Sequence, residues 1–161
     1  MKKVILLLIS TVLFFACTKQ VEKKNGNESI VLYDSIKAQQ FGADKYGMKR
    51  YVMAYLKRGP NRDQDSTTAV KLQKAHMNNI TRMAEEGKLV LAGPFLDDDE
   101  VRGIYIFDVE TIEEAKVLTE SDPAIKAGRL EMELRPWYGT AALKEVTKIA
   151  KTLVKEPIGG K

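Results

Sequence analysis

The chain has 161 residues, of which 44% are hydrophobic and 30% are charged. This length allows one domain with a tail and excludes a multidomain enzyme, and the hydrophobic fraction is too high for a wholly disordered chain. The formal net charge is +4, and two of the positive charges, Lys2 and Lys3, lie in a leader that we expect to be removed. The remaining charge is too small to indicate a nucleic-acid-binding protein, and a single cysteine cannot form an internal disulfide.

The first residues have the pattern of a bacterial export signal. The two lysines precede an apolar run over residues 4–15, which is shorter than the roughly 20 residues that a membrane-spanning helix needs. The run ends in Ala16 and Cys17, and a small residue directly before a cysteine resembles a bacterial lipobox, although Phe14 stands where leucine is usual. We predict a signal peptide over residues 1–16, a lipid on Cys17, and a location in the cell envelope outside the cytoplasm. The alternative is an ordinary secreted protein that is cleaved after Ala16.

The segment that follows Cys17 is rich in lysine, glutamate and asparagine up to about residue 27, which favours a flexible tether. Residues 29–47 carry scattered apolar side chains without a sustained period, and a short helix is expected near residues 35–40. The predicted division is residues 17–47 for the lipid-attached tether and edge segment, 48–154 for the domain with its C-terminal helix, and 155–161 for a tail.

Strands and helices alternate through the predicted domain. Branched and aromatic residues between glycines and prolines predict strands over residues 51–57, 88–92, 101–109 and 129–137. Apolar residues at spacings of three and four predict helices over residues 67–86, 111–120 and 140–154, and an aspartate before a proline predicts a short helix over 122–126. The order is the ferredoxin-like one of an α+β fold, in which two helices cover one face of a four-stranded antiparallel sheet. The other face also carries apolar residues, so a homodimer is expected.

Several short motifs resemble the YCII-related family. They are Ala75-His76 in the first long helix, the segment Gly87–Pro94, Arg102-Gly103, and Asp122-Pro123 followed by Ala127-Gly128. The resemblance covers about residues 51–137. It implies the dimeric α+β barrel fold and an acid/base pair formed by His76 and Asp122, and families of this fold include enzymes that act on small cyclic organic compounds. The export signal departs from the family, whose members are mostly cytoplasmic.

His76 is the only histidine and the main candidate for catalysis. Leu72, Ile80 and Met83 share its helix stripe, so its side chain is expected to face the sheet. An imidazole there can act as a general base when a carboxylate fixes its tautomer, and the alternative is a core histidine that is bonded to the backbone. The resemblance makes Asp122 that carboxylate. An aspartate before proline is also the pattern of a helix N-cap, and one carboxylate can do both.

Three further residues are candidates for binding a substrate. Arg102 stands at the start of the third strand, where its guanidinium can neutralise an anionic group; the alternative is a surface pair with the acidic run over residues 97–100. Arg58 and Tyr55 are expected to line the same cleft.

Other chemistries lack their residues. One histidine and one lipid-attached cysteine cannot form a zinc site of the usual nitrogen and sulfur ligands, and the acidic run lacks the spaced ligands of a calcium loop. No P-loop, dinucleotide or nucleophile-elbow motif is present. A haem on His76 would have no supporting residues around it. We therefore expect neither a metal nor a cofactor.

Three functions remain after these exclusions. The first is an enzyme in which His76 and Asp122 move a proton on a small organic substrate in an elimination or isomerisation. The second is a non-catalytic barrel that binds a small ligand. The third is a structural dimer whose C-terminal helix docks on an envelope partner. An accessible His76 with a bonded carboxylate favours the first, a His76 sealed away from an apolar cleft favours the second, and an uncovered apolar stripe on the C-terminal helix favours the third.

Overall fold

A computed structural model describes residues 32–156, and the described residues from Asp34 onward belong to one compact unit. The predicted signal peptide, the lipid site at Cys17, most of the tether and residues 157–161 of the tail lie outside the described residues. No helix among residues 32–156 combines the length and the apolar character that crossing a bilayer requires.

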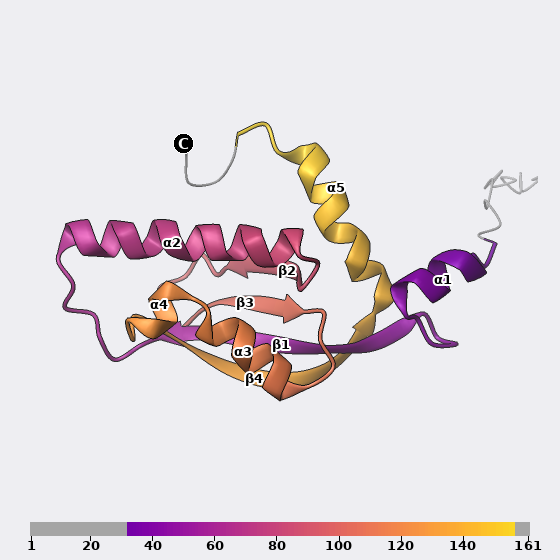
Figure 1. Cartoon of the computed structure of the whole chain (residues 1–161), viewed down its shortest axis with the longest axis horizontal. Coiled ribbons are helices and arrows are strands. Elements are labelled where there is room, and N and C mark those ends of the chain that lie inside the picture. Colours follow the sequence, from indigo (N-terminus) through magenta and orange to yellow (C-terminus); the bar gives the residue numbers. More distant parts are fainter. Residues whose placement is uncertain (1–31, 157–161) are drawn as a thin grey trace, which may run out of the picture. The chain divides into compact units, whose positions relative to one another are not determined.

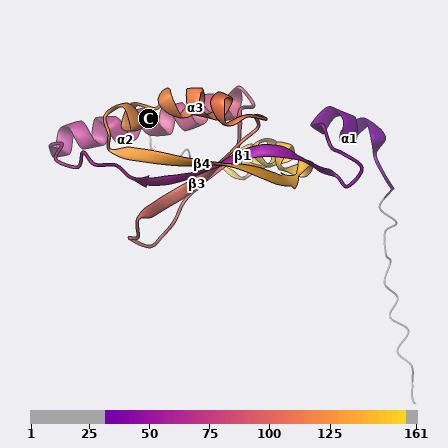
Figure 2. The same cartoon turned by 90° about the horizontal axis from the view of Figure 1, so that it is seen from below.

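The elements follow the predicted order. They are α1 (Ser35–Phe41), β1 (Met48–Arg58), α2 (Ser66–Glu85), β2 (Leu89–Pro94), β3 (Val101–Phe107), α3 (Ile112–Glu120), α4 (Pro123–Lys126), β4 (Leu130–Thr140), the 3₁₀ helix η1 (Ala141–Glu145) and α5 (Val146–Leu153) (Figure 1). The strands form one antiparallel sheet in the order β2-β3-β1-β4, and α2 and α3 lie on the same side of it (Figure 2). The prediction of a ferredoxin-like α+β fold with a C-terminal helix is confirmed.

Helix ends are set by polar side chains that satisfy free backbone N–H groups. Asp65 caps α2 by accepting a hydrogen bond from the N–H of Thr68 at 3.0 Å. Thr111 and Glu114 form a capping box at the start of α3, in which each side chain accepts a bond from the other residue's N–H. These caps fix where each helix begins and therefore which of its residues face the sheet.

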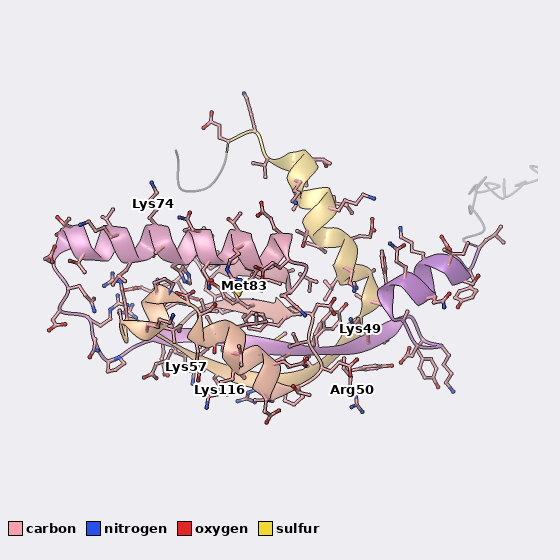
Figure 3. All side chains as sticks on the ribbon, in the orientation of Figure 1. Lys49, Arg50, Lys57, Lys74, Met83 and Lys116 are labelled. Carbon is pink, nitrogen blue, oxygen red and sulfur yellow. The ribbon has the colours of Figure 1, made fainter. Side chains whose placement is uncertain are left out.

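The two faces of the sheet pack differently because side chains alternate along each strand. Toward α2 and α3, the buried core contains residues from three strands and two helices, including Val52, Ala54, Leu56, Met83, Tyr105, Phe107 and Ala115. Met83 points from α2 toward the sheet, whereas Lys74 on the same helix points away (Figure 3). On the other face a smaller cluster of Tyr51, Val90 and Ile106 packs with Leu143 of η1.

The C-terminal region differs from the single helix predicted over residues 140–154. The ladder between β1 and β4 runs from Met48 opposite Thr140 to Arg58 opposite Leu130, so both strands extend past their predicted ends. This pairing keeps Thr140 in the strand, and the chain then forms η1 before α5 begins. Helical spacing of apolar residues cannot reveal such a division, because long-range strand pairing decides it.

An ion cluster holds η1 against the sheet. Asp108 accepts from Lys144 of η1 at 2.9 Å and also pairs with Lys49 of β1. Burial by itself raises the pKa of Asp108, but the two ammonium groups outweigh it, so that the pKa of this carboxyl lies below its ordinary value. The carboxylate therefore stays charged and ties the C-terminal region to β1.

Candidate active site

His76 and Asp122 lie in direct contact although 46 residues separate them in the chain. His76 comes from the sheet-facing stripe of α2, and Asp122 stands immediately before α4. The distance from His76 Nδ1 to Asp122 Oδ2 is 2.7 Å, and the two residues are 6% and 0% exposed. The structure thus brings together the two residues that the sequence singled out as an acid/base pair.

Asp122 has a second role at the start of α4. Its Oδ1 accepts a hydrogen bond from the N–H of Ala124 at 2.8 Å, while Oδ2 accepts from His76 and, at 3.5 Å, from the amide of Asn79. Burial alone raises the pKa of Asp122, but the His76 ring, Ala124 and Asn79 outweigh it, so the pKa of this carboxyl lies below its usual range. One ionised carboxylate is both the predicted N-cap and the histidine's partner.

The hydrogen bonds assign the tautomer of His76. An ionised carboxylate can only accept, so His76 Nδ1 carries the proton. In the neutral imidazole, Nε2 is then unprotonated and can accept from the hydroxyl of Tyr105, which lies 3.3 Å away. Burial and the charge of Asp122 raise the pKa of Tyr105, so its hydroxyl stays protonated. The network therefore presents Nε2 as a basic nitrogen.

A cavity of about 560 Å³ opens beside this network. His76 and Tyr105 form part of its wall, and most of the remaining wall is apolar, including Leu56, Met77, Ile80, Pro94 and Leu130. Three arginines, Arg62, Arg102 and Arg129, also line it, and no Asp or Glu is among the lining residues in the described part of the chain. A largely apolar hollow with a few polar groups on one wall is the usual form of a small-molecule site.

Of the two arginines that were predicted to bind a substrate, Arg102 lies in the cavity wall and Arg58 does not. Arg102 lines the cavity, and its Nη1 also donates to the carboxylate of Asp98 at 3.1 Å and to the carbonyls of Asp97 and Asp99. The acidic run over residues 97–100 therefore uses part of the hydrogen-bonding capacity of Arg102, as expected from the alternative of a surface pair. The prediction that Arg58 lines the cleft is wrong, because Arg58 is absent from the cavity wall and its guanidinium pairs with Asp98 at the end of β1.

Tyr55 was also expected in the cleft, and this prediction is wrong. Ala54 and Leu56, its neighbours on β1, belong to the core beneath α2, so the alternation of the strand turns Tyr55 to the opposite face. There the guanidinium carbon of Arg135 lies 5.8 Å from the centre of its ring.

Sequence reasoning missed four residues of this site: Asn79, Tyr105, Arg62 and Arg129. Asn79 follows His76 by three positions on α2, and this spacing alone would have placed both on one helix face. Tyr105 lies in a predicted strand, but only the register of Tyr105 opposite Ala54 shows which face it occupies. The two arginines carry no local signal, since their loops meet only in the folded chain.

These two loops are joined by backbone hydrogen bonds. The N–H of Gly59 donates to the carbonyl of Arg129 at 3.0 Å, and that of Asn61 donates to Gly128 at 2.9 Å. The Asn61 side chain donates to the carbonyl of Ala127 at 3.2 Å. Gly128 has a φ of +67°, which a residue without a Cβ adopts at little cost. The loops therefore form one fixed edge of the cavity.

Replacing Gly59 by alanine should loosen this edge. The new Cβ would collide with the carbonyl oxygen of Gly128 and lie 2.8 Å from the carbonyl carbon of Arg129; because both are backbone atoms, we expect a loss of about 1–3 kcal/mol in the free energy of unfolding. Urea denaturation measures it. Gly93→Ala is the matched control, because nothing lies within 4 Å of a Cβ there. Equal stability of the two variants would contradict the close approach.

Among residues 32–156, no group of three or more His, Cys, Asp or Glu side chains is placed to hold a metal ion.

The chain is similar to a solved structure, to one bacterial protein and to a domain family. A solved structure, 5-chloro-2-hydroxyhydroquinone dehydrochlorinase (TftG) from Burkholderia phenoliruptrix AC1100 in complex with 2,5-dihydroxybenzoquinone, aligns with a TM-score of 0.43 and 21% identity, over 54% of this chain and 92% of that one. Uncharacterized protein YjpA of Bacillus subtilis (strain 168) is 29% identical over 62 residues, which are 38% of this chain and 71% of the relative. Residues 50–138 match the YCII-related domain, and they make up more than half of the chain. The chain therefore belongs to the YCII-related family.

Proposed function

We propose that this chain is an enzyme in which His76, held by Asp122, moves a proton on a small organic molecule bound in the cavity. The observation that supports this most directly is the 2.7 Å bond between His76 Nδ1 and the buried carboxylate, with the same histidine in the cavity wall. A general base needs both a fixed tautomer and access to its substrate.

The reaction class we propose is elimination or isomerisation. In an elimination, Nε2 takes a proton from carbon, the C–H electron pair becomes the new C=C bond, and the leaving group departs with the electrons of its own bond. The imidazolium then gives its proton to the leaving group or to water. In an isomerisation the proton returns to a different atom of the same molecule. In both, the charge of Asp122 stabilises the imidazolium that forms.

Tyr105 does not block this step. Its hydroxyl is 3.3 Å from Nε2, which is long for a hydrogen bond between oxygen and nitrogen. A substrate C–H that approaches Nε2 from the cavity would displace this bond and leave the buried Tyr105 hydroxyl in need of a new acceptor. The free hydroxyl would then be able to donate to a substrate oxygen.

Deuterium incorporation from heavy water tests the proposal without a known substrate. A panel of small carbonyl and cyclic organic compounds is incubated with the wild type and with His76→Gln, and exchange of carbon-bound hydrogen is followed by NMR. We expect at least one compound to exchange about 100- to 10,000-fold faster with the wild type. Lys74→Gln, an exposed change on the same helix, is the control and should behave as the wild type. Exchange that is equal in wild type and His76→Gln would contradict the proposal.

The second candidate is a binding protein without turnover. The low exposure of His76 and the cover that Tyr105 gives to Nε2 favour it. Saturable binding of a compound in the cavity, with no deuterium incorporation into any member of the panel, would establish this alternative.

We propose in addition that the chain forms a homodimer through the face of the sheet opposite α2. Met53, Tyr55, Leu91 and Ile104 lie on that face and are only half-buried within one chain, and covering such apolar surface favours association. Sedimentation of the purified chain measures this, with Ile104→Glu as a variant that should be monomeric. A wild type that stays monomeric at about 100 μM would contradict the proposal.

A docking role for α5 is supported by its outer surface. Ile149 and Leu153 are 53% and 77% exposed, whereas Leu143 and Val146 of the same predicted stripe are half-buried. The double change Ile149→Ser and Leu153→Ser should release an envelope partner in a cross-linking experiment and leave the cavity unchanged. Identical cross-linked products from wild type and variant would argue against docking.

Attachment to a membrane through Cys17 is a proposal that rests on the sequence pattern around Ala16 and Cys17. Detergent phase partitioning of the protein from cells, with intact-mass analysis, tests it. The wild type should enter the detergent phase with the mass of a lipid on Cys17, and Cys17→Ser should not. A wild type in the aqueous phase, cleaved after Ala16, would show an ordinary secreted protein.

A further inference from the structure

We propose that Arg62 and Arg129 form an anion-binding subsite of the cavity that receives the carboxylate of a small organic acid. This inference rests on the proposed function for the identity of the cavity as the working site, and it adds the chemical class of the molecule bound there. The other end of the ligand would lie against the apolar wall beside His76.

The first observation is that these two guanidinium groups have only neutral partners. Arg62 Nη1 donates to the carbonyl of Arg129 at 3.3 Å, and Arg129 Nη1 donates to the side-chain oxygen of Gln64 at 2.9 Å. Neither forms an ion pair with a carboxylate of the described residues, in contrast to Arg58 and Arg102, which both pair with Asp98. Two positive charges therefore border the cavity with unused donors.

The second observation is that positive charges predominate around Arg62. Partial desolvation lowers the pKa of Arg62, the positive charges of Arg129, Arg58 and Arg102 lower it further, and the charge of Asp98 acts against them. Like charges held together cost free energy that an anion between them would offset. A guanidinium also offers two parallel N–H groups, which match the two oxygens of a carboxylate.

The third observation is that the fold fixes these charges relative to His76. Arg129 lies three residues after the end of α4, and the carboxylate that holds His76 caps the other end of this helix. The loop that carries Arg62 is bonded to the backbone of Gly128 and Arg129. The cavity wall that contains the two arginines and the histidine also contains apolar side chains such as Leu56, Ile80 and Leu130. This arrangement suits a molecule with one anionic end and an apolar body that reaches Nε2.

Calorimetric titration with defined probes tests the subsite on the full chain. Benzoate has an apolar ring and one carboxylate, benzamide has the same ring without the charge, and inorganic phosphate has the charge without the ring. We expect benzoate to bind with saturation at about 1 mM or below, benzamide to bind at least about 10-fold more weakly, and rising salt to weaken benzoate. No benzoate binding at about 10 mM, or benzamide binding as tightly, would overturn the proposal. Phosphate binding more tightly than benzoate would overturn the organic-acid assignment.

Substitutions locate the binding. Arg62→Gln and Arg129→Gln should each weaken benzoate by about 10-fold or more, because each removes charge-assisted hydrogen bonds. Arg50→Gln is the control: Arg50 is exposed on β1 and outside the cavity wall (Figure 3), and its loss should change the affinity less than about twofold. Unchanged affinity in both cavity variants would overturn the proposal. If Arg62→Gln fails to fold, Arg62→Lys, which keeps the charge and loses the paired donors, should still bind benzoate more weakly than the wild type.

Failure of this inference can be told from failure of the proposed function. His76→Gln should lose deuterium incorporation, while its benzoate binding should still weaken when Arg62 or Arg129 is replaced by glutamine. If benzoate binds through the two arginines but no compound exchanges hydrogen, the anion-binding subsite is supported and the enzymatic role is contradicted. If neutral compounds exchange hydrogen at a rate that Arg62→Gln and Arg129→Gln leave unchanged, the enzymatic role is supported and the anion-binding subsite is contradicted.

Discussion

Asp122→Ala is expected to lower the free energy of unfolding by about 3–5 kcal/mol. The change removes the carboxylate that accepts two buried hydrogen bonds in the wild type. One comes from His76 Nδ1 at 2.7 Å and the other from the N–H of Ala124 at 2.8 Å. It also leaves α4 without its N-cap, which alone costs about 1 kcal/mol. Urea denaturation at neutral pH measures the loss.

The matched control is Asp122→Asn, which has the same size. Asparagine caps helices as well as aspartate does, so the bond to Ala124 can persist, and we expect a loss well below that of alanine. A cost for Asp122→Ala under about 1 kcal/mol would show that the buried carboxylate contributes little.

The stability supplied by the Asp122 charge should depend on pH in one direction. Because its pKa is lowered in the folded chain, this contribution is fully present above the unfolded value near 3.9 and is lost as the pH falls from about 4 toward the folded pKa. The difference in unfolding free energy between wild type and Asp122→Asn should therefore shrink in this acidic window. A difference that is constant from pH 7 down to about 3 would contradict an ionised Asp122.

The second large effect concerns proton transfer in Asp122→Asn. An asparagine amide that faces His76 donates a hydrogen where the carboxylate accepted one, so the imidazole would carry its proton on Nε2 in place of Nδ1. The nitrogen that faces the cavity would then no longer be a base. We expect deuterium incorporation to fall by about 10,000-fold, as expected when a catalytic histidine is held in the wrong tautomer.

Nitrogen-15 NMR of the imidazole can detect this change directly. The wild type should show a protonated Nδ1 and a bare Nε2, and Asp122→Asn should show the reverse. Ser121→Ala serves as the control, because Ser121 is bonded to Asn79 and Leu118 but not to His76 or Asp122. An Asp122→Asn variant that keeps both the wild-type tautomer and the wild-type exchange rate would exclude Asp122 as a positioning residue.

Much of the fold could be predicted because its signals are local. The cap at Thr111 and the aspartate before Pro123 mark helix starts by rules that involve only a few neighbouring residues. The division of the C-terminal region at Thr140 could not be predicted in this way, since it depends on the pairing of that residue with Met48 across the sheet.

The acid/base pair of the candidate site could be predicted from the sequence, but the residues that line the cavity around it could not. His76 and Asp122 were found through a combination of motifs that resembles a family, and the structure brings them together. Tyr55 was misplaced because an alternating strand can be read in two registers when its neighbours on both faces are apolar. Arg62 and Arg129 were missed because their closeness depends on backbone bonds between two loops.

The shared carboxylate at Asp122 affects how relatives of this chain should be read. The N-terminus of α4 needs an acceptor there whether or not any chemistry takes place. Selection for folding alone would therefore keep an aspartate or asparagine at this position in descendants that have lost their substrate. No backbone group depends on the imidazole at position 76, and a neutral polar side chain could also donate a hydrogen bond to Asp122 from there. Under the proposed function, a homologue with the aspartate and without the histidine would be a folded but inactive relative, and the histidine would be the better marker of the reaction.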